Sequence, residues 1–401
     1  MSRVLIPLAI GLGVALWMLI SSLNETRFEK CPDHTCDYIW EDNNNNGEVD
    51  FTHRLEFVAT QSNSIHTETY RKLTYGEMLK NVDWTWKSTF WMLIALLMVA
   101  VRDLGYMLRI RLLTDRQLSW RQSFDVIMLW EFASALTPSV VGGAGIAVFI
   151  VNREGINMGK STAAVLITAL MDELFYLITV PLVILVVGMS DIFPPAEARM
   201  VFGYELNIQT IFLVGYFFMV LLTCFILFGV FFSPQGFKKI MLLFTKFPGL
   251  RRFRERAAKT GDEIIIASGE YKRKNLLFWV KCFAYTFFSW TARFWVVNFL
   301  ILAVTSVGML DNFLIYARQL IMWVIMLISP TPGGSGVAEY AFTTFLNDFL
   351  PQGALMGITL AIIWRLYSYF PYLFIGSVIL PRWLKKTGEK IKERKAQETP
   401  N

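Results

Sequence analysis

Long apolar runs separated by short polar segments dominate the chain. Residues 4–23 carry no charge over 20 positions, and residues 211–232 carry none over 22. An α-helix rises about 1.5 Å per residue, so about 20 apolar residues cross the hydrocarbon core of a bilayer. Four further runs with few charges reach this length, namely residues 88–108, 161–189, 276–304 and 355–380. The pattern therefore predicts about six full membrane spans.

Two other apolar stretches are each interrupted by glycine and proline. Residues 124–141 lead into Gly142-Gly143-Ala144-Gly145, and residues 313–329 lead into a proline-glycine segment at residues 330–336. Proline lacks an amide donor and glycine bends easily, so both segments predict helix breaks. Irregular backbone at membrane depth persists only where it is buried in protein or faces a wet cavity. We expect two re-entrant helix-break-helix hairpins, and two ordinary pairs of kinked spans are the alternative.

The two interruptions share a sequence pattern. Residues 137–147 and residues 331–338 both contain Thr-Pro, then Gly-Gly-x-Gly, then a β-branched residue followed by Ala. When the chain is threaded through the membrane by its loop charges, the two copies enter from opposite faces. We therefore predict an inverted repeat of broken helices, which in many transporters places a binding site near the bilayer midplane.

The basic residues predict the orientation of the chain. Residues 233–275 hold 11 Lys or Arg and 4 acids, and residues 382–401 hold 7 Lys or Arg and 3 acids. Residues 21–87, by contrast, hold 7 basic and 12 acidic residues. Because basic connecting segments stay on the cytoplasmic side, we expect both termini in the cytoplasm and the acidic loop outside. The expected location is the bacterial cytoplasmic (inner) membrane.

These boundaries divide the chain into four parts. Residues 1–23 form an N-terminal signal-anchor span, and residues 24–87 form an acidic extracytoplasmic loop. Residues 88–381 form the membrane domain, and residues 382–401 form a basic cytoplasmic tail. The expected fold class is all-α, a polytopic integral membrane protein.

Composition supports the membrane class and excludes several others. Of the 401 residues, 54% are hydrophobic and 17% are charged, and the mean hydropathy is +0.44. A soluble domain carries about a quarter charged residues, which argues against a water-soluble enzyme and against a disordered chain. Four cysteines and three histidines are too few for a disulfide-dense scaffold or a zinc-finger array. With a net charge of only +6, we expect no nucleic-acid partner.

The glycine clusters are candidate anion-binding sites. Backbone amides are exposed at the start of a half-helix, where the helix dipole favours an anion such as a phosphate. The same small residues can instead serve only to let helices pack closely. Because the pattern occurs twice, we favour the binding role for Gly142, Gly143, Gly145, Gly333, Gly334 and Gly336.

Charged residues inside the apolar runs form a second candidate set. Such charges are costly at membrane depth unless they are paired or hydrated. Arginine can hold a phosphate with two parallel hydrogen bonds, so Arg293 and Arg365 are candidates for binding a lipid headgroup. Glu339 and Arg365 can equally form a buried structural ion pair. The full set is Glu131, Asp172, Glu173, Arg293, Arg318, Glu339 and Arg365.

The acidic loop contains a candidate calcium loop and a candidate disulfide. Oxygen ligands spaced as in an EF-hand loop are provided by Asp42, Asn44, Asn46 and Asp50. His53 stands where a bidentate glutamate belongs, and a solvated Asn-rich turn is the alternative. Outside the cytoplasm, Cys31 and Cys36 are expected to form a short-loop disulfide.

The segment Pro330-Thr331-Pro332-Gly333-Gly334-Ser335-Gly336-Val337-Ala338-Glu339 is the most specific motif in the chain. It resembles the proline-glycine-glycine-x-glycine-x-x-glutamate signature of the lysylphosphatidylglycerol synthase family. The chain is similar to the flippase-like membrane region of that family over about residues 79–386. Weaker support comes from Thr137-Pro138 with Gly142-Gly143, from Arg153 and from Asp172-Glu173.

The resemblance implies a polytopic domain that moves an anionic or aminoacylated lipid between leaflets. It does not imply synthesis, because aminoacyl transfer in the full-length relatives uses a separate soluble domain. The first hypothesis is thus a flippase or transporter, not an enzyme, for a phospholipid, a glycolipid or a polyprenyl-phosphate lipid. The alternatives are a membrane-embedded transferase acting on a lipid-linked substrate and a small-solute or ion transporter.

Partners and coupling follow from the same hypothesis. Membrane lipid is the expected partner, and a homodimer and a separate lipid-modifying enzyme are further candidates. We expect no cofactor except calcium in the outer loop. No nucleophile motif, P-loop or Rossmann fingerprint is visible in the sequence. Proton coupling through Glu131, Asp172 or Glu339 is a further hypothesis.

Overall fold

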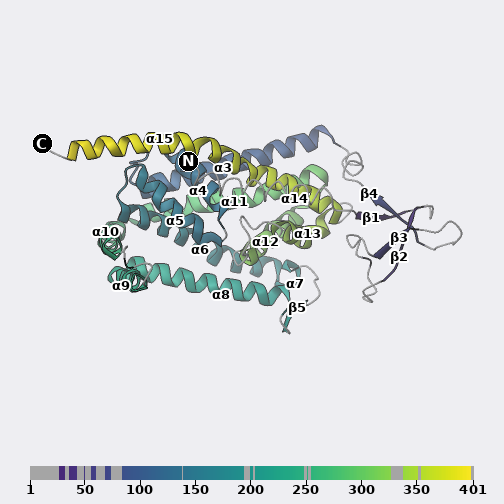
Figure 1. The fold of residues 1–401 in the computed structure, drawn as a ribbon. Coiled ribbons are helices and arrows are strands. Elements are labelled where there is room, and N and C mark those ends of the chain that lie inside the picture. The colour runs from purple at the N-terminus through teal and green to yellow at the C-terminus, as the bar shows by residue number, and fades with distance from the viewer. Residues whose placement is uncertain are drawn as a thin grey trace.

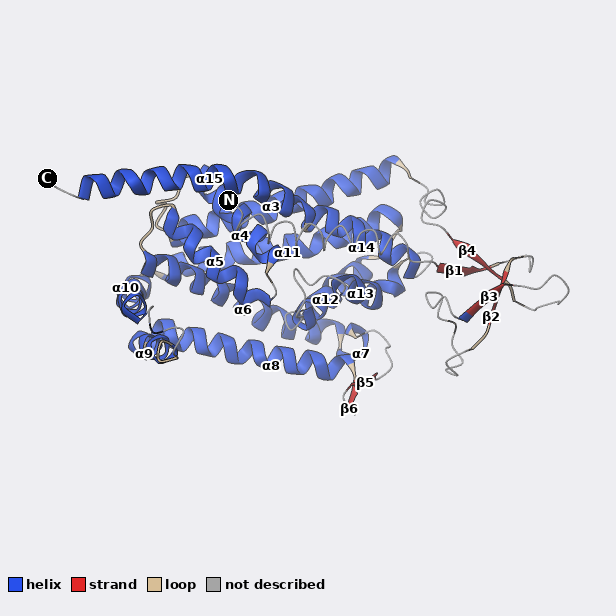
Figure 2. Cartoon of the chain, in the orientation of Figure 1, coloured by secondary structure: helices blue, strands red, loops and turns tan. Residues whose placement is uncertain are grey.

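The computed structural model shows a helical bundle with a small β-sheet beyond one end (Figure 1). Figure 2 shows that strands are confined to that end of the part drawn in colour. The predicted signal-anchor span at residues 1–23 lies outside the described residues. The described residues are 27–31, 36–42, 49, 56–59, 68–73, 84–137, 139–193, 199–201, 204–247, 251, 254–326, 337–350 and 354–398.

Within the described chain, six helical segments are long and apolar enough to cross a membrane. They are α3 (Trp86–Leu113), α6 (Met158–Val187), α8 (Ile208–Leu227) with the π-helical turn η2 (Phe228–Phe232), α11 (Leu276–Val304), α12 (Met309–Met326) and the segment Thr359–Glu389. Five of them coincide with predicted spans, so the prediction of an all-α, polytopic membrane region is confirmed. The sixth, α12, occupies the run that the sequence assigns to the first arm of the second hairpin.

Helices α3 and α11 pack side by side at a glycine. A Cβ atom at Gly105 would collide with the hydroxyl of Ser289, so only glycine fits at this point of α3. The Ser289 hydroxyl donates a hydrogen bond of 3.2 Å to the carbonyl oxygen of Arg102 across the same contact. This close approach holds the charged face of α3 against α11.

The first interrupted stretch forms two helices, but the break is not at the glycines. Helix α4 (Trp120–Leu136) ends before Thr137-Pro138, and α5 (Ser139–Arg153) runs through Gly142, Gly143 and Gly145. The prediction of a Gly-Gly-x-Gly break was therefore wrong for this copy. Proline disfavours helical geometry in the residue before it, and Thr137 is extended, with φ −98° and ψ 139°. Glycine inside a helix costs only about 1 kcal/mol, which neighbouring packing overcomes.

The second interrupted stretch is described only in part. Helix α12 ends at Met326, and α13 (Val337–Leu346) is followed by a 3₁₀ turn, η4 (Asn347–Phe349). Gly333, Gly334 and Gly336 lie outside the described residues. The re-entrant course of both hairpins and their relation as an inverted repeat stay predictions.

The last predicted span consists of two helices rather than one. Helix α14 (Ala354–Ser368) and α15 (Phe370–Glu398) are separated at Tyr369. Pro371 explains the interruption, because it has no amide to donate within the helix and its ring crowds the preceding turn. Helix α15 continues alongside α4, where Gly376 lies so close to Phe132 that no Cβ atom would fit.

A β-sheet forms in the acidic loop, which the sequence did not predict. Its antiparallel order is β1-β4-β2-β3, and Phe28, Phe57 and Tyr70 form its apolar core. The strands are β1 (Arg27–Lys30), β2 (Tyr38–Trp40), β3 (Phe57–Ala59) and β4 (Tyr70–Leu73). A separate hairpin, β5 (Arg199–Val201) and β6 (Tyr204–Leu206), lies between α8 and the short helix α7 (Met189–Ile192).

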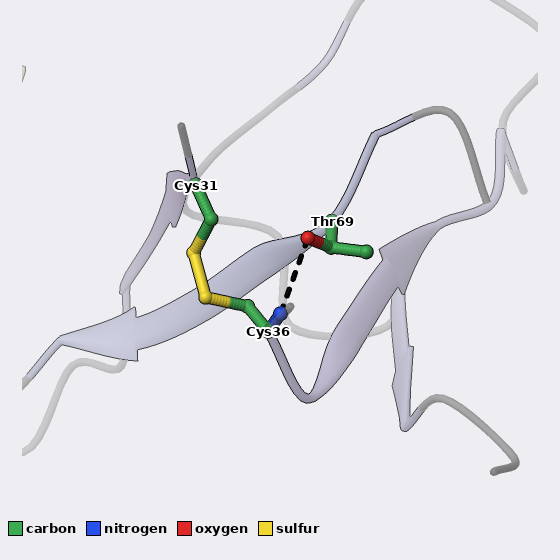
Figure 3. The surroundings of a disulfide bond; sticks show 3 residues. All are labelled: Cys31, Cys36 and Thr69. Atoms are coloured by element: carbon green, nitrogen blue, oxygen red, sulfur yellow. Dashed lines mark hydrogen bonds between the residues drawn. A yellow bond between two sulfur atoms is a disulfide. The ribbon is translucent and has the colours of Figure 1, made fainter. Parts of the chain in front are cut away.

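Cys31 and Cys36 form a disulfide beside this sheet (Figure 3). The amide of Cys36 donates a 3.2 Å hydrogen bond to the hydroxyl of Thr69, which connects the loop to the residue before β4. Of the predicted calcium ligands, Asp42 is described, whereas Asn44, Asn46 and Asp50 lie outside the described residues.

The opposite end of the bundle carries α9 (Pro234–Phe244), α10 (Arg254–Lys272) and the end of α15, which belong to the basic segments of the sequence (Figure 1). The turn after α3 is fixed there by Asp115, whose carboxylate accepts hydrogen bonds from Lys160 (2.7 Å) and Lys274 (2.5 Å). Partial burial opposes ionisation of Asp115, but these two ammonium groups outweigh it and lower the pKa of its carboxyl. The basic segments and the disulfide-bearing sheet thus lie at opposite ends.

Candidate functional site

A cavity of about 270 Å³ lies inside the helical bundle. Its walls come mainly from α3, α4, α6, α11, α14 and α15. Thr137, Met326 and Ser368 line it. Thr137 and Ser368 lie at the ends of α4 and α14, and Met326 is the last described residue of α12. These three positions therefore meet at one interior space, whose volume is close to the lower end of known ligand pockets, roughly 300 Å³.

Five of the seven predicted intramembrane charges line this cavity: Glu131, Asp172, Glu173, Arg293 and Arg365. They come from α4, α6, α11 and α14, so the fold brings together side chains that are up to 234 positions apart in the sequence, counted from residue 131 to residue 365. Aromatic side chains separate them, including Trp130, Trp290, Trp323 and Trp364. The cavity is thus a charged space with aromatic walls inside an otherwise apolar bundle.

Arg293 presents a guanidinium group whose charge no carboxylate balances directly among the described residues. Its guanidinium carbon lies 4.2 Å from the ring centre of Trp323 and 5.1 Å from that of Trp290. Such stacking on an aromatic face holds the cation in place without using its N–H donors. Within the described part of the chain, no side chain or carbonyl forms a hydrogen bond or an ion pair with Arg293. Its donors are therefore available to a ligand in the cavity.

Arg109 is a cavity residue that the sequence analysis missed, because its arginine-rich surroundings indicate a cytoplasmic connector. In the structure α3 continues to Leu113, and Arg109 lies inside the bundle, 4% exposed. Its guanidinium donates to Asp172 (2.5 Å) and to the hydroxyl of Thr286 (2.9 Å). The indole of Trp290 donates 2.8 Å to the same carboxylate oxygen of Asp172. The spacing of seven between Arg102 and Arg109 could have placed both on one face of a helix.

Glu131 belongs to a second paired group. It lies 3.6 Å from the guanidinium of Arg102, which is 1% exposed and also pairs with Asp103 at 3.1 Å. The hydroxyl of Tyr372 donates to Asp103 at 2.9 Å, and its ring lies 4.6 Å from the Arg102 guanidinium. Arg102, like Arg109, is therefore balanced by carboxylates of the protein itself.

Glu173 and Tyr176, like Thr168, are buried polar residues of the wall with a polar atom that has no hydrogen-bond partner within the described residues. Glu173 is 9% exposed, and its Oε2 atom finds no hydrogen-bond partner there. The hydroxyl of Tyr176, one helical turn further along α6, likewise finds none within the described part of the chain. Buried polar groups are usually satisfied, so these two point to a ligand or water.

Arg365 completes the set of cavity arginines. It is 7% exposed, and its guanidinium carbon lies 5.0 Å from the ring centre of Tyr369 and 5.4 Å from that of Trp364. It stands on the last turn of α14, where the helix is interrupted. The cavity therefore has two arginines from different helices, α11 and α14, each stacked on aromatic rings.

Comparison with known families identifies the membrane region. Residues 75–376 match the family described as "Lysylphosphatidylglycerol synthase TM region". The chain belongs to this family. It is also 25% identical over 301 residues to a protein of Archaeoglobus fulgidus described as "UPF0104 membrane protein", and this similarity covers 72% of this chain and 82% of the relative. No solved structure matches the chain.

Arg318 of this lysylphosphatidylglycerol synthase family member does not reach the cavity. Its guanidinium donates to Asp348 (2.8 Å) and to the carbonyl oxygens of Phe345 (3.0 Å) and Asp191 (3.1 Å). These bonds join α12 to the η4 turn and to α7. The structure therefore separates Arg318 from the other predicted site residues.

The glycines contribute to the cavity only through their neighbours in the described chain. Ala144 lines it, whereas Gly143 packs against Ser134 of α4, itself a lining residue. Gly145 is exposed, and a Cβ atom added there would meet no heavy atom within 4 Å, so it faces away from α4. Glu339 lies on α13, and its side chain is outside the described residues.

Proposed function

We propose that this protein moves a phospholipid with an anionic headgroup from one leaflet of the membrane to the other, without a chemical step. The observation that carries the proposal is Arg293, a stacked guanidinium without a carboxylate partner among the described residues, in an interior cavity. A phosphate diester is the lipid group that accepts parallel hydrogen bonds from a guanidinium. Membership of a family whose membrane region is flippase-like supports the same conclusion.

The cavity is suited to a group that binds transiently rather than permanently. A lipid headgroup crossing the membrane must exchange its hydration for protein donors, because a bare charge is costly in hydrocarbon. Arg293 supplies such donors, and the aromatic walls leave room beside them. Phosphate is common to anionic and aminoacylated phospholipids and to polyprenyl-phosphate lipids, so the same site serves all of these candidates.

The arrangement of the helices suggests how a headgroup could reach the cavity from either face of the membrane. Under this proposal α4 with α5, and α12 with α13, are the re-entrant arms that enter from opposite faces as an inverted repeat. Thr137, at the break between α4 and α5, and Met326, the last described residue of α12, both line the cavity, which supports a site between the arms. If one re-entrant arm at a time moved away from the rest of the bundle, the cavity would open to one leaflet at a time.

We also propose that α9, α10 and the C-terminus face the cytoplasm and that the sheet lies outside. Lys and Arg residues of connecting segments favour the cytoplasmic side, and α9, α10 and the end of α15 carry them at one end of the bundle (Figure 1). The Cys31–Cys36 disulfide at the other end suits an oxidising compartment. The bacterial inner membrane meets both conditions.

The experiment is translocation of a fluorescent lipid in vesicles. Purified protein is reconstituted with fluorescently labelled phosphatidylglycerol, and a membrane-impermeant reductant reports label on the outer leaflet. The wild-type protein is expected to expose label that protein-free vesicles keep protected. Arg293→Ala is expected to slow this exposure about tenfold or more, as for loss of a hydrogen bond to a charged group.

A matched variant controls for the loss of an arginine. Arg382 is exposed on α15 near its basic end and lies outside the cavity, so Arg382→Ala should translocate at the wild-type rate. Arg293→Lys keeps the charge but not the bidentate fork, and an intermediate rate is expected. Equal rates for all four proteins would refute the assignment of Arg293, and no translocation above protein-free vesicles would refute the function.

A further inference from the structure

We propose that Glu173 is a proton-binding site, and that an anionic headgroup and one proton enter the cavity together. This inference rests on the proposed function and adds the coupling ion to it. The notable feature is a carboxyl group that is nine-tenths buried, lines the cavity and has an oxygen without a hydrogen-bond partner among the described residues. The other cavity carboxylates are engaged, Asp172 by Arg109 and Glu131 by Arg102.

The described charges around the cavity include two ion-paired groups, and Glu173 and Arg293 lie outside both groups. Among the described side chains that line it or directly pair with its lining, four are arginines and four are carboxylic acids. The arginines are Arg102, Arg109, Arg293 and Arg365. The acids are Asp103, Glu131, Asp172 and Glu173. Two ion-paired groups account for Arg102, Arg109 and three of the acids, and Glu173 faces the same space as Arg293.

An anion that binds Arg293 changes the electrostatic surroundings of Glu173. It brings its own negative charge into the low-dielectric space that Glu173 also faces, where like charges repel strongly. A proton on the Glu173 carboxylate forms a neutral acid and removes this repulsion, with no other bond made or broken. By linkage, headgroup binding and proton binding must then favour each other by the same factor.

The charged and titratable groups around Glu173 come from several of the helices that line the cavity. The lining contains no charged group from α8 or α12 among the described residues, because Met219, Trp323 and Met326 are their contributions. At the far end of α6, α10 places Glu270 near Lys160, outside the cavity. The titratable and charged groups that face the cavity are Tyr106 and Arg109 (α3), Glu131 (α4), Asp172 and Tyr176 (α6), Arg293 (α11), Arg365 (α14), Tyr369, and Tyr372 (α15).

Tyr176 extends the site toward a proton path. Its hydroxyl has no partner among the described residues and lies on the same face of α6, three positions after Glu173. A hydroxyl both donates and accepts, so it can stabilise either form of the carboxyl. We therefore expect Tyr176→Phe to alter the rate of proton exchange without removing the proton site.

The test measures proton uptake when the headgroup binds. Purified protein in weakly buffered detergent solution is titrated with dihexanoylphosphatidylglycerol, a pH-indicator dye reports protons, and intrinsic tryptophan fluorescence reports binding near Trp290 and Trp323. The wild-type protein is expected to take up to about one proton per bound lipid, and its apparent affinity should fall by up to about tenfold per pH unit as pH rises. Glu173→Gln should bind the lipid with no proton uptake and with an affinity independent of pH.

Glu270→Gln, the same substitution on exposed α10, is the matched control and should behave as wild type. Wild-type binding without proton uptake, or uptake that persists in Glu173→Gln, would overturn the proton site while leaving the proposed function intact. A Glu173→Gln variant that loses affinity only for dihexanoylphosphatidylethanolamine would also overturn it, because Glu173 would then bind an ammonium group. Failure of the wild-type protein to bind either lipid would overturn both proposals.

Discussion

Two arginines of the cavity differ in what balances their charge. Arg109 is held by Asp172 and Thr286, whereas Arg293 is held only by the faces of two indole rings among the described residues. Removing one member of a buried ion pair leaves an uncompensated charge, but removing an uncompensated charge does not. The guanidinium of Arg109 therefore has a structural role, whereas the guanidinium of Arg293 is available to a ligand.

This contrast predicts opposite effects on stability and transport. Asp172→Asn is expected to lower the free energy of unfolding by about 3 kcal/mol, because it leaves the buried Arg109 guanidinium without its carboxylate partner. Arg293→Ala is expected to leave that free energy nearly unchanged and to abolish most lipid movement. Thermal unfolding in detergent, followed by fluorescence, measures the first effect. Equal destabilisation by both variants would contradict the distinction.

Asp115 predicts how stability at the basic end depends on pH. The pKa of its carboxyl is lowered in the folded protein, so its contribution is present above the unfolded pKa and is lost as pH falls through the folded one. Its backbone has φ 51°, a conformation that asparagine tolerates, so Asp115→Asn changes the charge without straining the turn. Acid unfolding should begin at a similar pH in the variant with a shallower slope. An unchanged slope would show that the two lysines contribute nothing there.

At the level of elements, the sequence predicted which helices exist better than it predicted where they begin and end. The long apolar runs identified five spans, because about twenty consecutive apolar residues are typical of a membrane-spanning helix. The break at Thr137 was misplaced because proline acts on the residue before it, while glycines are absorbed by packing. The sheet was missed because its strands have only three or four residues. Arg109 was missed because hydropathy does not define the end of a span to within a turn.

The glycines of α5 give a paired test of that explanation. A Cβ atom at position 143 would press into Ser134 of α4, so Gly143→Ala should destabilise the protein by about 1–3 kcal/mol. A Cβ atom at position 145 meets nothing within 4 Å, so Gly145→Ala should stabilise the helix by up to about 1 kcal/mol. Thermal unfolding of both variants decides the matter. The reverse order would mean that α4 and α5 do not pack as described.

Helix α9 predicts a second element-scale property. Ile240, Leu243 and Phe244 of this helix, with Phe247 just after it, form an exposed apolar stripe at helical spacing, and Lys239 borders it. Such a helix lies in the bilayer interface with its apolar face buried. Figures 1 and 2, which share one orientation, show α9 end-on while α8 runs lengthwise.

The position of α9 can be measured with spin labels in a Cys224→Ser, Cys282→Ser background. A label at Phe244→Cys should collide with oxygen dissolved in the bilayer, and a label at Gln235→Cys, exposed on another face of the same helix, should collide with a water-soluble relaxation agent. Aqueous accessibility at both positions would place α9 away from the membrane.

At the level of the whole molecule, the charges are sorted by place. Helices α9 and α10 and the end of α15 lie at one end, the sheet of the acidic loop lies at the other, and the cavity holds buried charges between them. The sequence singled out five of these charges because charges within apolar runs are rare unless they serve a purpose. It could not predict which charges pair, since Arg318 and Arg293 look alike in sequence and only the tertiary fold gives one of them Asp348.

The most direct measurement is a cryo-electron microscopy map of the protein in a nanodisc that contains phosphatidylglycerol. The account predicts density for a lipid phosphate within hydrogen-bond distance of Arg293, between Trp290 and Trp323, with acyl chains leading out of the bundle. A cavity closed to lipid, with Arg293 bound instead to a carboxylate of its own chain, would contradict it.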